Sequence, residues 1–200
     1  GNETTPSCTV LEGKGTVVSM STNIASDAAV TPRLGAMNPQ PVGKKKAAIF
    51  AKGNNNRLEI AQGCNLRGVH IEINGEDCLI KIERDTIIGE DSYLSSRERG
   101  TQLIIGADCM FSRNVKIMTS DGHDILREKQ RINPAQSIQI GNHVWLADNV
   151  TILKGVNIGD GSVVGINSTL TKSIEEQQIA VGSPAKVIAS DISWRDELTF

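Results

Sequence analysis

Aromatic residues are scarce in this chain of 200 residues, where Phe, Trp and Tyr together make up 3%. A globular core of ordinary shape buries several rings, so this scarcity favours a narrow core filled by Ile, Leu and Val. An excess of one charge is also lacking, because 21 Lys and Arg face 23 Asp and Glu and leave a net charge of −2. No global field indicates nucleic acid as a partner, and we interpret the lysine run at 44–46 as a solvated turn.

No apolar run approaches the length of about 18 residues that a membrane span needs, and the N-terminus lacks a charged-then-apolar signal pattern. We therefore expect a cytoplasmic protein without a membrane span. No Cys-x-x-Cys pair occurs, so we expect reduced, mostly buried thiols at the four cysteines, Cys8, Cys64, Cys78 and Cys109. The histidines are 53 and 20 residues apart, which is not the spacing of a zinc site, and we expect no metal: His70, His123 and His143.

A six-residue period organises the stretch 138–171. The aliphatic positions at this spacing are Ile140, Leu146, Ile152, Ile158, Val164 and Leu170. The next residue is small in four of these six repeats, at Gly141, Ala147, Gly159 and Gly165. Period six is typical of a solenoid in which short strands alternate with turns and one aliphatic side chain per repeat faces a shared axis. The stretch predicts an all-β fold, a left-handed parallel β-helix of hexapeptide repeats.

The period continues upstream of this stretch, with one interruption. Ile105, Phe111 and Ile117 lie six residues apart, but Ile105 and Ile140 are 35 residues apart, which is not a multiple of six. Residues 119–137 therefore leave the solenoid as an excursion loop, and such insertions often carry a functional site. Further upstream, the alternation around Asn74-Gly75 would suit a hairpin, but we favour imperfect coils with longer strands.

We expect three parts in one domain. Residues 1–47 form an irregular lead-in with one or two short strands. Residues 48–172 form the β-helix with its loop at 119–137. Residues 173–200 close the structure and end in a short C-terminal helix that contains Trp194 and caps the open end.

Two residues could carry chemistry. His123 lies in the excursion loop, and an imidazole with an ordinary pKa of about 6.5 is a natural general base for a hydroxyl. A carboxylate of neighbouring Asp121 or Asp124 could fix its tautomer, although spacing alone slightly favours an ordinary exposed loop histidine. Trp145 either packs against a neighbouring subunit or has a functional role, in which it shapes a substrate cleft or offers its backbone N–H to an oxyanion.

Three further residues have two possible interpretations each, and His70 has one. His143, beside Trp145, is either an outward-facing coil residue or part of a site, whereas His70 is expected on a strand surface. Lys172 and Lys186 flank the end of the repeats. They are either ordinary surface lysines or contacts for the phosphates of a nucleotide-like cofactor.

Three segments carry a resemblance to a known family. The hexads from Ile140 to Ile152, the stretch from Gly155 to Gly165, and the closing Ala180-Val-Gly-Ser-Pro-Ala-Lys186 resemble the hexapeptide-repeat acyltransferases, over about residues 102–190. Within that family, Ser120-Asp-Gly-His-Asp-Ile125 followed by His143-Val-Trp145 is similar to the bacterial capsule and polysaccharide O-acetyltransferases.

This resemblance implies a homotrimer that acts on hydroxyls of a bacterial capsular or surface polysaccharide, with acetyl-coenzyme A in the groove between subunits. His123 would be the base for direct attack on the thioester, Trp145 would line the cleft, and we assign His143 and Asp121 to acceptor binding. The positions that match the family's cofactor contacts are Ala147, Gly165, Thr171, Lys172, Ser183, Pro184 and Lys186.

The chain departs from the family pattern in two places. Ala147 stands where a glycine is more usual, and His123 is followed by Asp124 rather than proline, which argues against maltose or galactosides as acceptors. Two alternatives stay open: an N-acetyltransferase for an amino sugar-nucleotide or small xenobiotic, and a non-catalytic β-helix scaffold.

Overall fold

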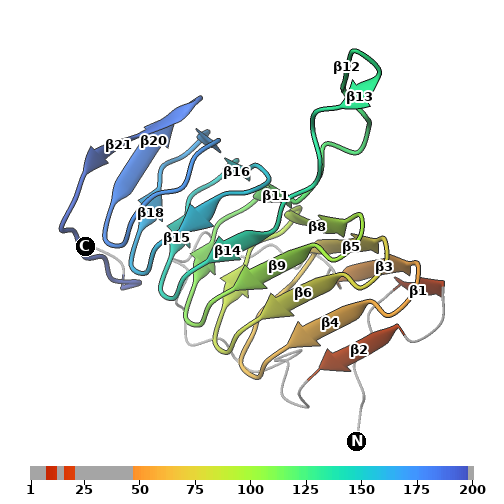
Figure 1. The fold of residues 1–200 in the computed structure, drawn as a ribbon. Coiled ribbons are helices and arrows are strands. Elements are labelled where there is room, and N and C mark those ends of the chain that lie inside the picture. Colours follow the sequence, from red (N-terminus) through yellow and green to blue (C-terminus); the bar gives the residue numbers. More distant parts are fainter. Residues whose placement is uncertain (1–7, 13–15, 21–46, 198–200) are drawn as a thin grey trace, which may run out of the picture.

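The structure is a computed structural model that describes residues 8–12, 16–20 and 47–197. Three parallel sheets, here called A, B and C, form the sides of a prism (Figure 1). Sheet A contains, in spatial order, β1 (Cys8–Glu12), β3 (Ala48–Lys52), β5 (His70–Asn74), β8 (Tyr93–Arg97), β11 (Lys116–Met118), β16 (Thr151–Ile152) and β19 (Thr169–Leu170). Sheet B contains β2 (Val17–Met20), β4 (Arg57–Ile60), β6 (Leu79–Ile82), β9 (Gln102–Ile105), β14 (Ile138–Ile140) and β17 (Asn157–Ile158).

Sheet C contains β7 (Ile87–Ile88), β10 (Met110–Phe111), β15 (Trp145–Leu146), β18 (Val163–Val164), β20 (Ile179–Gly182) and the antiparallel β21 (Ala185–Ala189). The chain passes from A to B to C in each coil, so the prism has an A–B edge, a B–C edge and a C–A edge. No helix among the described residues is long and apolar enough to cross a membrane.

The aliphatic residues of the six-residue period point into the prism, and we call this column of side chains the inward lane. Ile140 pairs with Ile158 in sheet B, and the other repeat positions pair in the same way, Leu146 with Val164 in sheet C and Ile152 with Leu170 in sheet A. Each partner lies 18 residues further along, so three hexads make one coil. All six side chains are buried. The prediction of stacked coils around an aliphatic axis is therefore confirmed.

The early coils are longer because their strands are longer. Strands β3 to β9 in sheets A and B have four or five residues, against two in β15 to β19. Register neighbours such as Ile82 and Ile105 are therefore 23 residues apart rather than 18. Asn74-Gly75 connects β5 of sheet A to β6 of sheet B, and both strands pair in parallel with others. The hairpin alternative for this turn is wrong.

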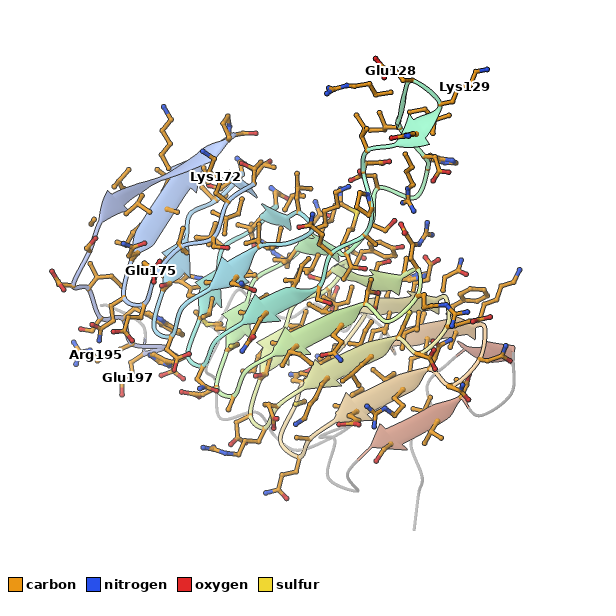
Figure 2. All side chains as sticks on the ribbon, viewed as in Figure 1. Glu128, Lys129, Lys172, Glu175, Arg195 and Glu197 are labelled. Carbon is orange, nitrogen blue, oxygen red and sulfur yellow. The ribbon has the colours of Figure 1, made fainter. Side chains whose placement is uncertain are left out.

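Between β11 and β14 the chain leaves the A–B edge. This excursion forms an antiparallel hairpin of β12 (Leu126–Arg127) and β13 (Gln130–Arg131), which stands away from the prism (Figure 1). Glu128 and Lys129 form its tip, with φ angles of 49° and 64° (Figure 2). The tip is thus remote from the stacked coils, whereas the start of the excursion lies against them.

At the N-terminal end of the prism the expected short strands of the lead-in are present, whereas the C-terminal end differs from the prediction. In the lead-in, β1 and β2 pair in parallel with β3 and β4, so the coils begin there; residues 21–46 lie outside the described residues. The expected C-terminal helix is wrong for residues 191–197, which contain none. Asp191 has a φ of +58°, and the Ile192 N–H donates to the Gln177 carbonyl, which holds the chain against the last coil. The remainder of the expected helix, residues 198–200, lies outside the described residues.

Three of the cysteines belong to the core. Cys64, Cys78 and Cys109 are buried and free. Burial raises the pKa of the Cys109 thiol to about 12, so it stays protonated at neutral pH. The side chain of Cys8 lies outside the described part of the structure.

Candidate active site

His123 lies at the start of the excursion, before β12, and its side chain is exposed. Gly122, which precedes it, has a φ of +80° and donates its N–H to Ser120 Oγ at 3.0 Å, forming the turn that carries the histidine. Within the described part of the chain the ring has no hydrogen-bond partner. Both ring nitrogens are therefore available to a ligand.

Asn133 fixes the backbone around His123 from inside the loop. Its side chain is 7% exposed. Its Nδ2 donates to the His123 carbonyl and to Asp121 Oδ2, both at 2.8 Å, and its Oδ1 accepts from the Ile125 N–H at 2.7 Å. Asn133 was not among the predicted site residues, and the only signal for it was the Asn133-Pro134 pair in the loop.

Asp121 does not orient the histidine. Its carboxylate accepts from Lys154 Nζ at 2.5 Å, and this hydrogen bond is the main reason why the pKa of Asp121 is lowered. Asp124 pairs instead with Arg131 Nε at 2.9 Å. The expectation that a neighbouring carboxylate fixes the tautomer of His123 is therefore wrong, because both candidates are held by cations.

Glu98 anchors the excursion to the prism. Its two carboxylate oxygens accept from the Arg131 guanidinium at 2.6 and 2.7 Å, and they also accept from Ser120 Oγ at 2.7 Å and from the Ala135 N–H at 3.4 Å. The bonds from Arg131 lower the pKa of Glu98 to about 2. One side chain thus holds the beginning, the hairpin and the end of the loop.

Replacing Glu98 by glutamine is expected to loosen this loop without unfolding the prism. The glutamine amide is uncharged and has one acceptor oxygen instead of two, so it cannot form the bidentate ion pair with the Arg131 guanidinium. We therefore expect hydrogen exchange over residues 120–136 to rise roughly three- to tenfold. In the wild type the same loosening is expected as the pH falls from 4.5, the ordinary pKa of a glutamate, to about 2, because the folded-state pKa is depressed. Exchange mass spectrometry, corrected for intrinsic rates, measures both effects.

The control for this experiment is Glu76→Gln. Glu76 is a half-buried glutamate that pairs with Arg99, away from the loop. Loop exchange that is equal in the wild type and in Glu98→Gln would contradict the anchoring role, as would loop acceleration of the same size in Glu76→Gln.

Trp145 lies on the outer face of sheet C, beside Met110 and Val163 in register. Its backbone N–H donates to the Ser162 carbonyl at 3.0 Å, so the expectation that this group serves an oxyanion is wrong. The indole Nε1–H, in contrast, is buried and has no partner within the described residues. A buried donor without a partner is costly, so this N–H is the unsatisfied donor of Trp145, and the Trp194 ring lies against the Trp145 ring with centroids 5.9 Å apart.

His143 lies on the B–C edge, where the C-terminal segment covers it. Its Nδ1 lies 2.9 Å from Asp108 Oδ2 and its Nε2 lies 3.1 Å from the Trp194 carbonyl oxygen. The imidazole of His143 and the indole of Trp194 stack with their centroids 4.0 Å apart, and Trp194 Nε1 donates to the His143 carbonyl at 2.9 Å. Both ring nitrogens are occupied, so this geometry favours a role in holding the C-terminal segment over the predicted role in binding acceptor.

The predicted cofactor residues fall into two groups. Ala147 and Gly165 stack in consecutive coils on the C–A edge, since the Ala147 N–H donates to Val164 and the Gly165 N–H donates to Ala180. Next to Gly165 lies the β20–β21 hairpin. Its turn contains the exposed Ser183 and Pro184, and its second strand contains the exposed Lys186.

Thr171 and Lys172 form the second group. They follow β19 on the A–B edge, and both are exposed. Strand β19 contacts both strands of the β20–β21 hairpin. Figure 2 shows Lys172 at the same end of the prism as this hairpin.

One chain does not bring all the predicted site residues together. His123 and Asp121 lie at the A–B edge and Trp145 lies on the outer face of sheet C. Ala147 and Gly165 lie on the C–A edge and His143 on the B–C edge. His70 is exposed on β5, as predicted, with its ring centroid 5.5 Å from that of Tyr93. A site that contains both His123 and Trp145 therefore requires two prisms side by side.

The chain is similar in sequence and in fold to known proteins. Residues 137–172 match the family model described as bacterial transferase hexapeptide (six repeats). A polysialic acid O-acetyltransferase of Neisseria meningitidis is 35% identical over 150 residues, which are 72% of this chain and 68% of that protein. One from Escherichia coli O1:K1 is 34% identical over 139 residues, 68% of this chain and 44% of that protein. The chain thus spans about two thirds of the first relative and less than half of the second.

A solved structure is similar over nearly the whole chain. The polySia-specific acetyltransferase NeuO superposes with a TM-score of 0.71 at 28% sequence identity, and the match covers 96% of this chain and 84% of that one. The likeness therefore includes the early coils, which the family model does not reach.

Proposed function

Because this chain belongs to the hexapeptide-repeat acyltransferases and is similar to the polysialic acid O-acetyltransferases within that family, we propose that it transfers acetyl groups from acetyl-coenzyme A to hydroxyls of a bacterial capsular or surface polysaccharide. The observation that carries this proposal is the exposed, unpartnered imidazole of His123 on a loop that Asn133 and Glu98 hold in place. Such a ring has the chemistry of a general base and is pre-positioned for it.

His123 acts on the acceptor hydroxyl. A free imidazole nitrogen accepts the hydroxyl proton while the oxygen attacks the thioester carbonyl carbon; the carbon–sulfur bond then breaks. The imidazolium returns the proton to the departing thiolate, so no proton is gained or lost overall. No acyl-enzyme is needed, and a positioned base supplies roughly 10²- to 10⁴-fold of the rate.

Trp145 contributes its indole N–H rather than its backbone. The Nε1–H is buried without a partner within the described residues. Charge develops on the thioester oxygen during the attack, and a donor fixed in a desolvated site stabilises that charge strongly. The unpartnered indole donor of Trp145 supports a role in holding the oxyanion, for which the ring must turn so that its N–H reaches the cleft.

We place the pantetheine arm of the donor along the C–A edge, where the small residues Ala147 and Gly165 lie in consecutive coils. Gly165 packs closely against its own chain, since a Cβ built there would lie 2.6 Å from Val181 Cγ1. The exposed Lys186 and Lys172 supply cations for phosphates. These residues fit acetyl-coenzyme A as the acetyl donor, and we place the reaction in the cytoplasm, where that donor is made.

We infer a homotrimer of left-handed coils. The hexapeptide period implies the handedness, and the separation of His123 from Trp145 supports a ring in which each site takes the base from one subunit and the tryptophan from its neighbour. The hairpin at the end of the excursion exposes the apolar side chains of Ile125 and Leu126, at 54% and 60%. In such a ring these side chains would pack against the adjacent subunit.

The test is acetylation of a glycan freed of O-acetyl groups. The purified protein is incubated with acetyl-coenzyme A and polysialic acid, and both thiol release and glycan mass are followed. We expect one thiol for each acetyl group added and removal of the acetyl group by mild alkali, which cleaves esters and leaves amides. Alkali-resistant product would indicate N-acetylation, and no transfer to any acidic or neutral capsular glycan would contradict the proposal.

A further inference from the structure

Arg97 lies where the excursion leaves the prism. It is the last residue of β8 in sheet A, and its backbone N–H donates to Thr119 Oγ1 at 2.9 Å. Its guanidinium contacts the turn that carries the base, since a Cβ built on Gly122 would lie 3.2 Å from Arg97 Nη1. Arg97 is therefore next to the residue that precedes His123.

The guanidinium is held in a fixed orientation but is not saturated. Its Nη2 donates to Glu72 Oε1 at 2.6 Å, and the Tyr93 hydroxyl donates to the other oxygen of Glu72, also at 2.6 Å. A guanidinium has five N–H donors. The Nε–H is buried and has no hydrogen-bond partner within the described residues, so the donors that a ligand can meet are those of Nη1 and the second N–H of Nη2. About one third of the side chain is exposed, at 33%.

The charges around this position leave the surface open to an anion. The carboxylates at the root of the excursion are already paired, Asp121 with Lys154 and both Glu98 and Asp124 with Arg131. Lys116, in register with Tyr93 on the neighbouring strand, is exposed and adds a positive charge to the same outer face of sheet A. Glu72 pairs with Arg97, so the ion pairs at the root balance one another, and Lys116 is the additional positive charge that a negative group meets on this face.

We propose that Arg97 binds the carboxylate of an acidic sugar in the acceptor glycan and thereby determines which glycans are acetylated. Glu72 and Tyr93 act as positioning residues, because they fix the plane of the guanidinium. A planar fork of N–H groups matches a carboxylate better than a lysine ammonium does. This inference rests on the proposed function, because it names the acceptor group that is recognised at the same site.

The test compares two acceptors that differ in one group. The first is polysialic acid freed of O-acetyl groups, and the second is the same polymer with its carboxylates converted to neutral amides. For the wild type we expect KM for the amide polymer to exceed KM for the acid polymer roughly 10- to 100-fold, as expected for a hydrogen bond to a charged group. Arg97→Gln is expected to raise KM for the acid polymer by a similar factor and to leave KM for the amide polymer unchanged.

Two further variants separate recognition from folding. Arg97→Lys keeps the charge and the partner of Glu72, so it is expected to fold and to show an intermediate KM for the acid polymer. Arg84→Gln removes an exposed arginine that pairs with Asp85 at 2.9 Å, away from the excursion, and is expected to change neither KM. For all variants, KM for acetyl-coenzyme A is expected to stay at the wild-type value.

The outcomes distinguish this inference from the proposed function. If the wild type acetylates both polymers with equal KM, or if Arg97→Gln and Arg97→Lys impair both polymers equally, the proposed function stands and the role of Arg97 is overturned. If the wild type acetylates neither polymer, nor any neutral capsular glycan, both proposals are overturned.

Discussion

Replacing His123 by alanine is expected to lower kcat for acetyl transfer roughly 10²- to 10⁴-fold, which is the usual contribution of a positioned general base. The ring makes no hydrogen bond to the described residues, so its removal should not disturb the loop. We therefore expect KM for acetyl-coenzyme A and the thermal stability to remain at their wild-type values. Steady-state thiol release at saturating glycan measures the effect.

The matched control is His70→Ala. His70 is an exposed histidine on β5 whose ring also lacks a hydrogen-bond partner among the described residues. It is expected to retain wild-type kcat. Acetyl transfer by His123→Ala at near wild-type rates would contradict the assignment of the base.

Replacing Phe111 by alanine is expected to lower the free energy of unfolding by about 3–5 kcal/mol. Phe111 is 1% exposed and continues the inward lane of sheet C between Ile88 and Leu146. Each coil of a solenoid is supported mainly by its two neighbours, so a cavity there weakens the contacts on both sides. Urea unfolding followed by circular dichroism measures the change.

Met110→Ala is the control, because Met110 is the outward-facing neighbour on the same strand and is only half-buried. We expect it to cost clearly less than the loss at Phe111. Equal losses at the two positions would mean that the inward lane does not carry the stability of the prism.

The prism was predictable because its burial pattern is local. Every third hexad returns to the same sheet, and each hexad has one buried aliphatic residue, as at Ile140 and Ile158. The sequence therefore shows an aliphatic residue at every sixth position. The early coils were less clear, because strands of four and five residues stretch the repeat. Even there, the alternation of apolar and polar residues from Val69 to Ile73 indicated strands, and burial alternates along β5 in the structure.

The surroundings of the base were not predictable, because stacking joins residues that are distant in sequence. Glu98 contacts Arg131, 33 residues away, and His143 contacts Trp194, 51 residues away. Neither contact has a local signature. The expected C-terminal helix failed for the same reason, since Trp194 is held by its stack on His143 rather than by helical neighbours.

Assembly of mixed oligomers tests whether His123 of one subunit and Trp145 of the next form one site. His123→Ala and Trp145→Ala subunits, each expected to have little activity alone, are co-expressed in equal amounts and purified as mixed oligomers. In random assembly about one quarter of the sites combine an intact His123 with an intact Trp145, because each is present with a probability of about one half. We predict recovery of about one quarter of the wild-type activity. Mixed oligomers that are no more active than oligomers of either variant alone would show that His123 and Trp145 of adjacent subunits do not share a site.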